Sequence, residues 1–307
     1  MEIREHWDYD EFPEPAEVPA EAVRIATTGD EDCASYVPDV VYATRDGREL
    51  HLQLVLPDSR NSRLAHERGG ARALCPCLVY VQGSGWAKQN CYHAVPKVAK
   101  LASRGIAVAI VEYREAEVAT FPAQVMDAQR AVRFLSRHGD AFGIDPERLV
   151  IGGCSSGGHT AVFAALLADE KGRPASELPV CGIIDLYGAV SFMRADGYPT
   201  TTDSGSPESP EGQLMGGDLR ANCELRAKGS AETYIGEETP LPPVLIAHGT
   251  KDRMVSCEVS IDFYRHLRAT GHDAELVLLE GADHGGSEFF ADPVVSAYER
   301  FIRRCVG

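Results

Sequence analysis

Short apolar segments alternate along this chain with longer segments in which apolar residues recur at helical spacing. The apolar segments lie at 77–81, 106–111, 149–151, 180–186, 244–247 and 275–279. The segments with helical spacing lie at 93–104, 122–138, 156–168, 258–269 and 292–303. Helices that connect successive strands let those strands run parallel, and a strand that is apolar throughout must be covered on both faces. The pattern therefore predicts an α/β fold with a mostly parallel central sheet and helices on both faces.

A β-hairpin is predicted ahead of these segments. Alternating residues at 40–44 and 49–56 flank Asp46 and Gly47, a dipeptide typical of tight turns. Such a hairpin adds an antiparallel edge to the sheet. A chain of 307 residues has room for one domain of this class, so we expect a single α/β domain over residues 39–307.

Residues 1–38 differ in composition from the rest of the chain. They hold eleven acidic and two basic residues, so −9 of the total net charge of −16 falls there, together with four prolines. We predict an acidic N-terminal extension that is solvated along its length. A contact between two copies of the chain, which would make a homo-oligomer, and a cover over the functional site stay open as alternative roles.

The charge and cysteine content restrict the classes of partner. A net charge of −16 argues against nucleic acid or an anionic membrane as a main partner, because both require a cationic surface. The start of the chain has no basic segment followed by an apolar one, and no apolar run approaches the ~18 residues of a membrane span. Nine cysteines without regular spacing then indicate a reducing, cytoplasmic compartment. The closest pair, Cys75 and Cys77, lacks a second pair at ligand spacing, so we expect buried thiols and no metal site.

One segment, 187–240, interrupts the alternation of strands and helices. It is rich in Gly, Pro, Ser, Thr and charged residues and has a helical pattern only near 223–228. A departure of this length between two core strands is uncommon unless it serves a function. We predict a small cap over the functional site, and a surface insertion remote from the site is the alternative.

The most informative motif is Gly-Cys-Ser-Ser-Gly, which begins at Gly153 between a predicted strand and a predicted helix. In a strand-to-helix turn of this kind the serine hydroxyl stands above the sheet. The residues two before and two after the serine pack against each other, so both favour glycine. Ser155 has Gly153 and Gly157 at those positions, whereas Ser156 has Cys154 at the first of them. Ser155 is therefore the predicted nucleophile, and the Cys154 side chain is expected to point into the packing.

A serine hydroxyl needs a base, and the base needs a carboxylate that fixes its tautomer. In this architecture both follow later in the chain, beyond the carboxyl ends of later strands. Asp252 lies in the loop after the apolar segment 244–247, and His284 lies between glycine-rich residues after 275–279. The order serine, acid, histidine is the order expected of this fold. Four other residues were weighed against these two, and the acids among them stay open as alternatives: His159 in the helix after the serine, and Asp185, His248 and Asp283 in or after later strands.

Hydrogen-bond donors for an oxyanion are predicted in two places. Ser156 begins the helix after the nucleophile, so its N–H lies at the positive end of the helix dipole and is one candidate donor. The loop after 77–81 reads Gln-Gly-Ser-Gly-Trp, and its small residues let the backbone approach a substrate. The N–H groups of Ser84 and Gly85 are the candidates there, and a tight structural turn is the alternative. Trp86 is expected either to line the substrate pocket or to pack the loop.

With these residues in place, the chain resembles the α/β-hydrolase superfamily over roughly residues 38–305. It is most similar to the carboxylesterase branch that includes hormone-sensitive-lipase-like esterases and acetyl-xylan and feruloyl esterase-like hydrolases. The segment 153–159 is similar to the G-x-S-x-G-G-H signature of that branch, and the segment 206–217 is similar to an insertion found in it. Asp252 and His284 match the acid and base positions of the branch.

The loop before Trp86 departs from the pattern of the branch, which usually has His-Gly-Gly-Gly ahead of the tryptophan. Gln82 stands in place of the histidine and Ser84 in place of the middle glycine. This departure leaves open which N–H groups of the loop point inward and what shape the acyl pocket takes.

The resemblance implies a serine carboxylesterase that acts on a small ester without a cofactor or metal. The proton of Ser155 passes to His284, which Asp252 orients, and an acyl-enzyme then yields to water. Two alternatives stay open. The same residues would serve an amide-cleaving peptidase or formamidase, and a protein that keeps the pocket without the reaction would be a non-catalytic binding module.

Overall fold

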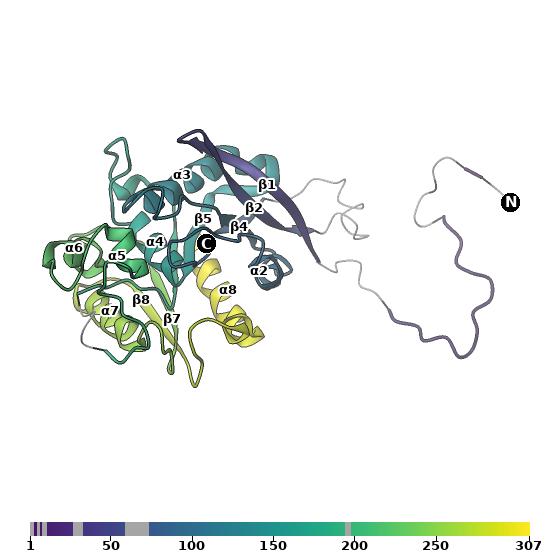
Figure 1. The fold of residues 1–307 in the computed structure, drawn as a ribbon. Coiled ribbons are helices and arrows are strands. Elements are labelled where there is room, and N and C mark those ends of the chain that lie inside the picture. Colours follow the sequence, from purple (N-terminus) through teal and green to yellow (C-terminus); the bar gives the residue numbers. More distant parts are fainter. Residues whose placement is uncertain (1–2, 5–6, 8–10, 27–32, 59–73, 194–197) are drawn as a thin grey trace.

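The computed structural model describes residues 3–4, 7, 11–26, 33–58, 74–193 and 198–307. A single eight-stranded sheet, in the order β1-β2-β4-β3-β5-β6-β7-β8, runs through the domain (Figure 1). The strands are β1 Cys33–Arg45, β2 Arg48–Asp58, β3 Cys75–Val81, β4 Ala107–Val111, β5 Ile144–Cys154, β6 Gly182–Leu186, β7 Val244–Gly249 and β8 Ala274–Leu279. The six strands β3 to β8 are parallel to their neighbours among themselves, and β2 is antiparallel to both β1 and β4. The predicted α/β fold, with its parallel sheet and antiparallel hairpin edge, is confirmed.

The hairpin is longer than predicted. Strand β1 begins at Cys33, so the last residues assigned to the N-terminal extension pair with β2. The register shifts between Val37 and Val40, and Asp39 there has a φ of 52°. Such a bulge disrupts the alternation of apolar and polar residues, which is why the pattern predicted a strand only beyond it.

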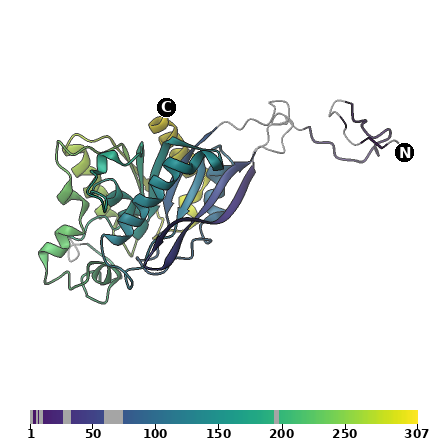
Figure 2. The same ribbon diagram turned by 90° about the horizontal axis from the view of Figure 1, so that it is seen from above.

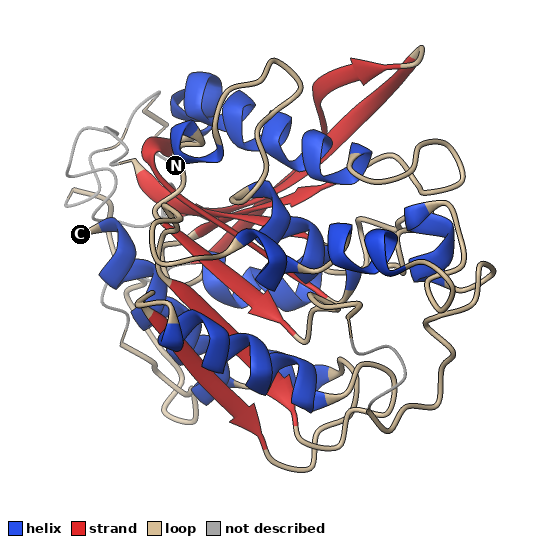
Figure 3. Cartoon of the chain, turned by 90° about the vertical axis from the view of Figure 1, so that its left-hand side faces the viewer, coloured by secondary structure: helices blue, strands red, loops and turns tan. Residues whose placement is uncertain are grey.

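Helices cover both faces of the sheet (Figure 3). The α-helices are α2 Val95–Ala102, α3 Ala123–His138, α4 Ser156–Ala164, α5 Pro210–Met215, α6 Cys223–Lys228, α7 Cys257–Ala269 and α8 Asp292–Val306. Short 3-10 helices are η1 Gly139–Phe142, η2 Ala175–Glu177, η3 Ala231–Tyr234 and η4 Ser287–Phe290. Helices α3, α4 and α7 pack into one apolar core on one face, and α2 and α8 pack into a second core on the other.

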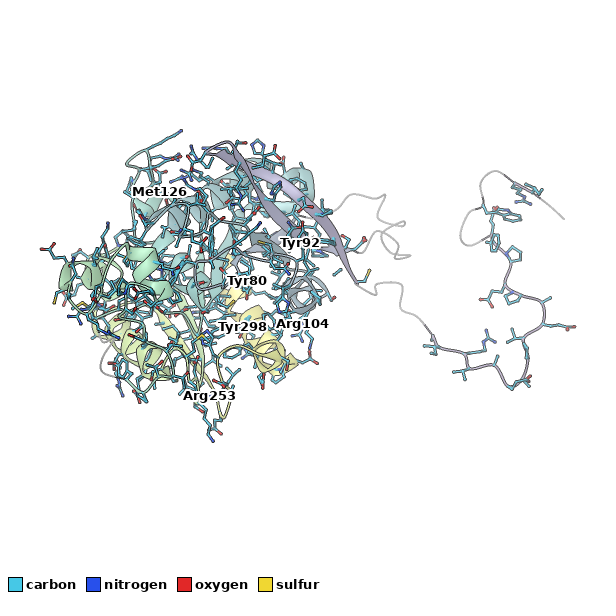
Figure 4. All side chains as sticks on the ribbon, in the orientation of Figure 1. Tyr80, Tyr92, Arg104, Met126, Arg253 and Tyr298 are labelled. Carbon is cyan, nitrogen blue, oxygen red and sulfur yellow. The ribbon has the colours of Figure 1, made fainter. Side chains whose placement is uncertain are left out.

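The buried strands explain this two-sided arrangement. Every residue of β4 and of β6 is buried, so their side chains need an apolar partner on each face. Tyr80 of β3 and Tyr298 of α8 lie in the second core, in the middle of the molecule, whereas Arg253 projects from its edge (Figure 4). The loops that carry the candidate site residues therefore leave from the ends of strands that are buried on both faces.

The interrupting segment 187–240 packs against the first core instead of forming a separate domain. Leu214, Leu219 and Ala231 from this segment are fully buried there. Helix α5 was not predicted, although Ser209 caps it by accepting a hydrogen bond from the N–H of Gly212. Seen from above, the helices of this segment and the β1–β2 hairpin lie toward opposite ends of the domain (Figure 2).

Residues 11–26 of the N-terminal extension contain no helix or strand, and each of them is exposed. They run apart from the domain in Figure 1. Within the described ranges, no helix combines the length and the apolar character that crossing a bilayer requires. Cys77 is buried within β3, and Cys75 donates a weak hydrogen bond to the carbonyl oxygen of Gly143.

Candidate active site

Ser155 stands on a sharp turn between β5 and α4. Its backbone has φ 53° and ψ −125°, a left-handed conformation that is costly for any residue with a side chain. Strong surrounding contacts hold it there, because its N–H donates to the carbonyl of Leu186 at 2.9 Å and its own carbonyl accepts from the N–H of His159. The turn lifts the Ser155 hydroxyl above the carboxyl end of the sheet.

Two glycines make this turn sterically feasible. A Cβ added to Gly157 would lie 1.9 Å from the carbonyl oxygen of Val81, and one added to Gly153 would lie 2.4 Å from the carbonyl oxygen of Gly157. Both contacts are with backbone, which cannot turn aside as a flexible side chain can. The close packing that the sequence predicted around Ser155 is thus present in the structure.

His284 and Asp252 form a continuous hydrogen-bonded chain with Ser155. The Nε2 atom of His284 lies 2.9 Å from Oγ of Ser155, and its Nδ1 atom lies 2.7 Å from Oδ2 of Asp252. The three residues come from the ends of β5, β7 and β8, which are far apart in the sequence and meet at one edge of the sheet. The structure therefore brings together the three side chains that the sequence singled out.

The carboxylate of Asp252 is held on both oxygens. Oδ1 accepts from the backbone N–H groups of Met254 and Val255, at 2.8 and 2.9 Å, and Oδ2 accepts from His284. Burial raises the pKa of Asp252, but the hydrogen bonds from His248 and His284 outweigh it and hold the pKa below the usual range of an aspartic acid. A charged Asp252 is thus the form that this environment stabilises.

His248, which was weighed against His284 as the base, is a second imidazole on the same carboxylate, and the sequence did not indicate this contact. Its Nε2 atom lies 3.0 Å from Oδ2 of Asp252 and 2.9 Å from the carbonyl oxygen of Val255, so this nitrogen carries the proton. Its Nδ1 atom then accepts from the hydroxyl of Ser260 at 2.7 Å. The side chain is fully buried, and its position at the end of β7 was the only signal for it.

The weighed alternatives are engaged elsewhere. Asp283 binds the side chain of Arg253, at 2.7 Å from its Nε, and points to the exposed rim. Asp185 is fully buried at the end of β6, where burial raises its pKa to about 7 while His248 opposes the shift. Burial lowers the pKa of His159 to about 3, and the ring stacks on Phe192 with centroids 5.2 Å apart. None of these three side chains has a recorded hydrogen bond to the Ser155 hydroxyl or to the imidazole of His284. Asp283 contacts His284 only through the backbone, by accepting its N–H.

The loop proposed to hold an oxyanion is tied to helix α4 by polar contacts. The N–H of Ser84 donates to Oγ of Ser156 at 2.9 Å, so this predicted donor is already engaged. The Ser84 hydroxyl contacts the buried hydroxyl of Tyr113 at 2.9 Å, and burial raises the pKa of Tyr113 to about 12. The N–H of Ser156 belongs to the first turn of α4, which has no partner within a helix. The N–H of Gly85 has no partner among the described residues either.

Trp86 is buried in the core and does not line the cavity beside Ser155 that is described below. It is 1 % exposed and lies edge-on to His159 and Phe192, with ring centroids 5.1 and 6.0 Å apart. Its backbone φ of 55° is a left-handed conformation, which turns the side chain into the core behind the loop. Of the two roles open for Trp86, the structure supports packing of the loop.

A cavity of about 330 Å³ opens beside the Ser155 hydroxyl. Its walls come from the loop 82–85, the first turn of α2, the loop after β8, and the aromatic side chains of Tyr80, Tyr187 and Phe290. The ring of Tyr187 meets that of His284 edge-on, with centroids 4.9 Å apart. Within the described part of segment 187–240, only Tyr187 lines this cavity, and Pro210 packs against Gly85 at its side. Over the described ranges, no group of three or more metal-binding side chains was found.

The fold and the site together define the class of protein, which is the α/β-hydrolase class. A carbohydrate esterase from gut microbiota has a matching structure, with a TM-score of 0.72, 22% identity, and coverage of 90% of this chain and 98% of that one. The butyrate-bound esterase Est2 of Thermogutta terrifontis matches with a TM-score of 0.65 and 23% identity, over 88% of this chain and 94% of that one.

The family follows from the sequence comparison. The chain belongs to the BD-FAE family, whose model matches residues 66–267. A relative in Arabidopsis thaliana, isoprenylcysteine alpha-carbonyl methylesterase, is 27% identical over 84% of this chain and 64% of its own length. Esterase LipC of Mycobacterium tuberculosis is 24% identical over 81% of this chain and 63% of its own length. The chain thus spans slightly less than two thirds of each of these two relatives.

Proposed function

We propose that the protein is a serine carboxylesterase that cleaves small carboxylic esters through an acyl-enzyme on Ser155. The observation that carries this proposal is the hydrogen-bonded chain from Ser155 through His284 to the buried Asp252, at the wall of a cavity. The names of the relatives, which are a methylesterase and an esterase, support ester cleavage over other reactions of this fold.

In the proposed reaction, Oγ of Ser155 attacks the carbonyl carbon of the ester while its proton passes to Nε2 of His284. The tetrahedral intermediate collapses, and the same proton goes to the departing alkoxide. A water molecule then gives its proton to His284 and attacks the acyl carbon, which releases the acid and restores the Ser155 hydroxyl. Asp252 accepts the Nδ1–H of His284 throughout, so the imidazole keeps its Nε2 atom aimed at the serine.

The oxyanion is held by the N–H groups of Ser156 and Gly85, which have no other partner in the described chain. Each such donor is worth on the order of 10²-fold in rate when it is aimed at the developing charge. Ser84 was predicted to donate its N–H to the oxyanion. In this proposal its N–H instead bonds to Oγ of Ser156, which holds the loop of Gly85 beside the first turn of α4.

The test is hydrolysis of 4-nitrophenyl butyrate by the wild type, Ser155→Ala and a matched control, Ser103→Ala. Ser103 is an exposed serine at the end of α2, and among the described residues its hydroxyl bonds only to the carbonyl of Ala99. We expect Ser155→Ala to lose on the order of 10⁴-fold or more in kcat, and the control to keep full activity. Equal rates for the wild type and Ser155→Ala would refute the proposal.

Two other readings are separated by the same assay. Faster turnover of butyryl-4-nitroanilide than of its ester would favour an amide-cleaving enzyme that uses the same three residues. No turnover of either substrate, together with an unmodified Ser155 after treatment with a phosphonylating agent, would favour a binding protein. The cytoplasmic location, the N-terminal extension as a separate element, the cap role of 187–240 and the pairing of two copies stay predictions from the sequence.

A further inference from the structure

The cavity beside Ser155 contains an unpaired cation. Among its lining residues there is no aspartate, glutamate or arginine, and Lys97 is the single lining side chain with a permanent charge. Lys97 forms no ion pair with any described carboxylate; its recorded partner is the ring of Phe290, whose centroid lies 5.8 Å from Nζ. The described lining of the cavity therefore carries one ammonium group and no carboxylate.

Neighbouring cations on the same side of the domain are treated differently. Lys100, one turn further along α2, pairs with Asp292 at 3.1 Å, and Arg104 also approaches Asp292 and Glu299. Acidic partners are therefore available to the basic residues of this region that face away from the cavity. Lys97, which faces the cavity, has no such partner among the described carboxylates.

The position of Lys97 on its helix adds to the positive potential. Helix α2 has no acidic residue in its first turn and no side-chain cap at Ala94, and Lys97 lies in that first turn. The first turn of a helix favours negative charge, so a cation there is opposed by the helix dipole. The backbone donors are already used, because the N–H of Val95 donates to Tyr92, that of Lys97 donates to Ala94, and Pro96 has none. An anion at this place would therefore contact the ammonium group itself.

We infer that the ester cleaved at Ser155 carries an anionic oxygen group, such as a carboxylate, on the part that lies against Lys97. This inference rests on the proposed function and names its substrate class. The anion would remove the unfavourable opposition between Lys97 and the dipole of α2, while Tyr80, Tyr187 and Phe290 would contact the apolar part of the substrate. The net charge of the whole chain does not place a carboxylate against this anion, because no acidic residue belongs to the cavity lining and the imidazole of His284 separates Asp252 from it.

The test compares matched substrates that differ in one charge. On the acyl side, mono-4-nitrophenyl adipate carries a carboxylate where 4-nitrophenyl hexanoate carries a methyl group. On the alcohol side, 4-acetoxybenzoate is compared with its neutral methyl ester. Each pair is measured with the wild type, with Lys97→Met, which keeps an unbranched side chain one atom shorter and removes its charge, and with the control Lys100→Met.

We expect the wild type to favour the charged member of one pair, which also tells on which side of the ester the anion lies. Lys97→Met should lower kcat/KM for that member about fivefold, the scale of a partly exposed ion pair, mainly through KM. Its rates with the neutral members should stay within about twofold, and Lys100→Met should leave both ratios unchanged.

Two results overturn the inference, and they differ in what else they refute. Ratios of charged to neutral substrate that are the same in the wild type and Lys97→Met, with Ser155-dependent cleavage of the neutral esters, would refute the substrate class and leave the esterase proposal standing. Absence of Ser155-dependent cleavage of every ester would refute both.

Discussion

Substitution of Gly157 by alanine is the most direct perturbation of the turn that holds Ser155. The added Cβ would lie 1.9 Å from the carbonyl oxygen of Val81 and 2.7 Å from its carbonyl carbon. Ordinary contact between such atoms is about 3.4 Å or more, so either the start of α4 or the end of β3 has to move by roughly 1.5 Å. Both are buried backbone, and neither can move alone without breaking hydrogen bonds in the sheet or the helix.

The expected loss in free energy of unfolding follows from this displacement. Overpacking a buried site destabilises proteins by about 1–3 kcal/mol or more, and the backbone contact places Gly157→Ala at or above the upper end. For a domain of this size, 3 kcal/mol corresponds to a fall in Tm of roughly 6–12 °C. Activity should fall further, because Ser155 moves with the turn and its 2.9 Å contact with His284 is lost. A misplacement of about 1 Å costs on the order of 10²-fold in rate.

The assay pairs thermal melting with hydrolysis of 4-nitrophenyl butyrate, and the control is Gly236→Ala. A Cβ at Gly236 would meet no atom within 4 Å, and its backbone is not left-handed. We expect the control to melt and react as the wild type does. A Gly157→Ala protein that melts within 1–2 °C of the wild type and keeps its kcat/KM within threefold would refute the steric reasoning for this turn.

Three further predictions concern the buried groups behind the site. Asp252→Asn should lower kcat on the order of 10³–10⁴-fold with little change in KM, because the imidazole of His284 loses the acceptor that fixes its tautomer; a tenfold effect would argue against this role. His248→Phe should lower kcat about tenfold, because Oδ2 of Asp252 loses one of its two imidazole donors, and an unchanged kcat would make His248 purely a packing residue. Native Asp185, with a pKa of about 7, holds a proton that the unfolded chain has released above its ordinary value of 3.8. The free energy of unfolding should therefore fall as the pH rises from about 4 through 7, and Asp185→Asn should flatten this fall in thermal melts at pH 5 and 8. If the wild type and Asp185→Asn lost the same stability between pH 5 and pH 8, the raised pKa of Asp185 would be contradicted.

The elements that could be predicted from the sequence are those whose burial imposes a simple period. Strand β4 is buried on both faces and reads as an uninterrupted apolar segment, so its existence and direction followed at once. Strand β1 lies at the edge of the sheet and contains a bulge at Asp39, so its period is broken and its first residues were missed. Helix α5 has only six residues, too few for a helical period, and its cap at Ser209 was the one available signal.

The site also contains features that could be predicted from the sequence and features that could not. The close approach of Gly153 and Gly157 is a consequence of the turn alone, and the chain order of Ser155, Asp252 and His284 follows from the fold, so these positions could be chosen from the sequence. The contacts between loops could not be predicted in this way, because they depend on the path that each loop takes after it leaves its strand.

Three residues show how the path of a loop determines its contacts. The N–H of Ser84 turns toward Ser156, and the left-handed backbone of Trp86 sends its ring into the core. His248 meets Asp252 because the loop after β7 folds back on its own strand. Lys97 could not be recognised from the sequence either, because a lysine on a helix is ordinarily solvated and the cavity in front of it is formed by other loops.

The central claim is that Ser155 attacks as a nucleophile with His284 as its base. It is tested most directly by mass spectrometry of the intact protein, and of its peptides, after brief treatment with an excess of a fluorophosphonate. We expect one adduct per chain, located on Ser155, that is absent from Ser155→Ala and forms far more slowly in His284→Ala. An unmodified wild-type chain, or an adduct that forms at another residue and persists in Ser155→Ala, would contradict the account.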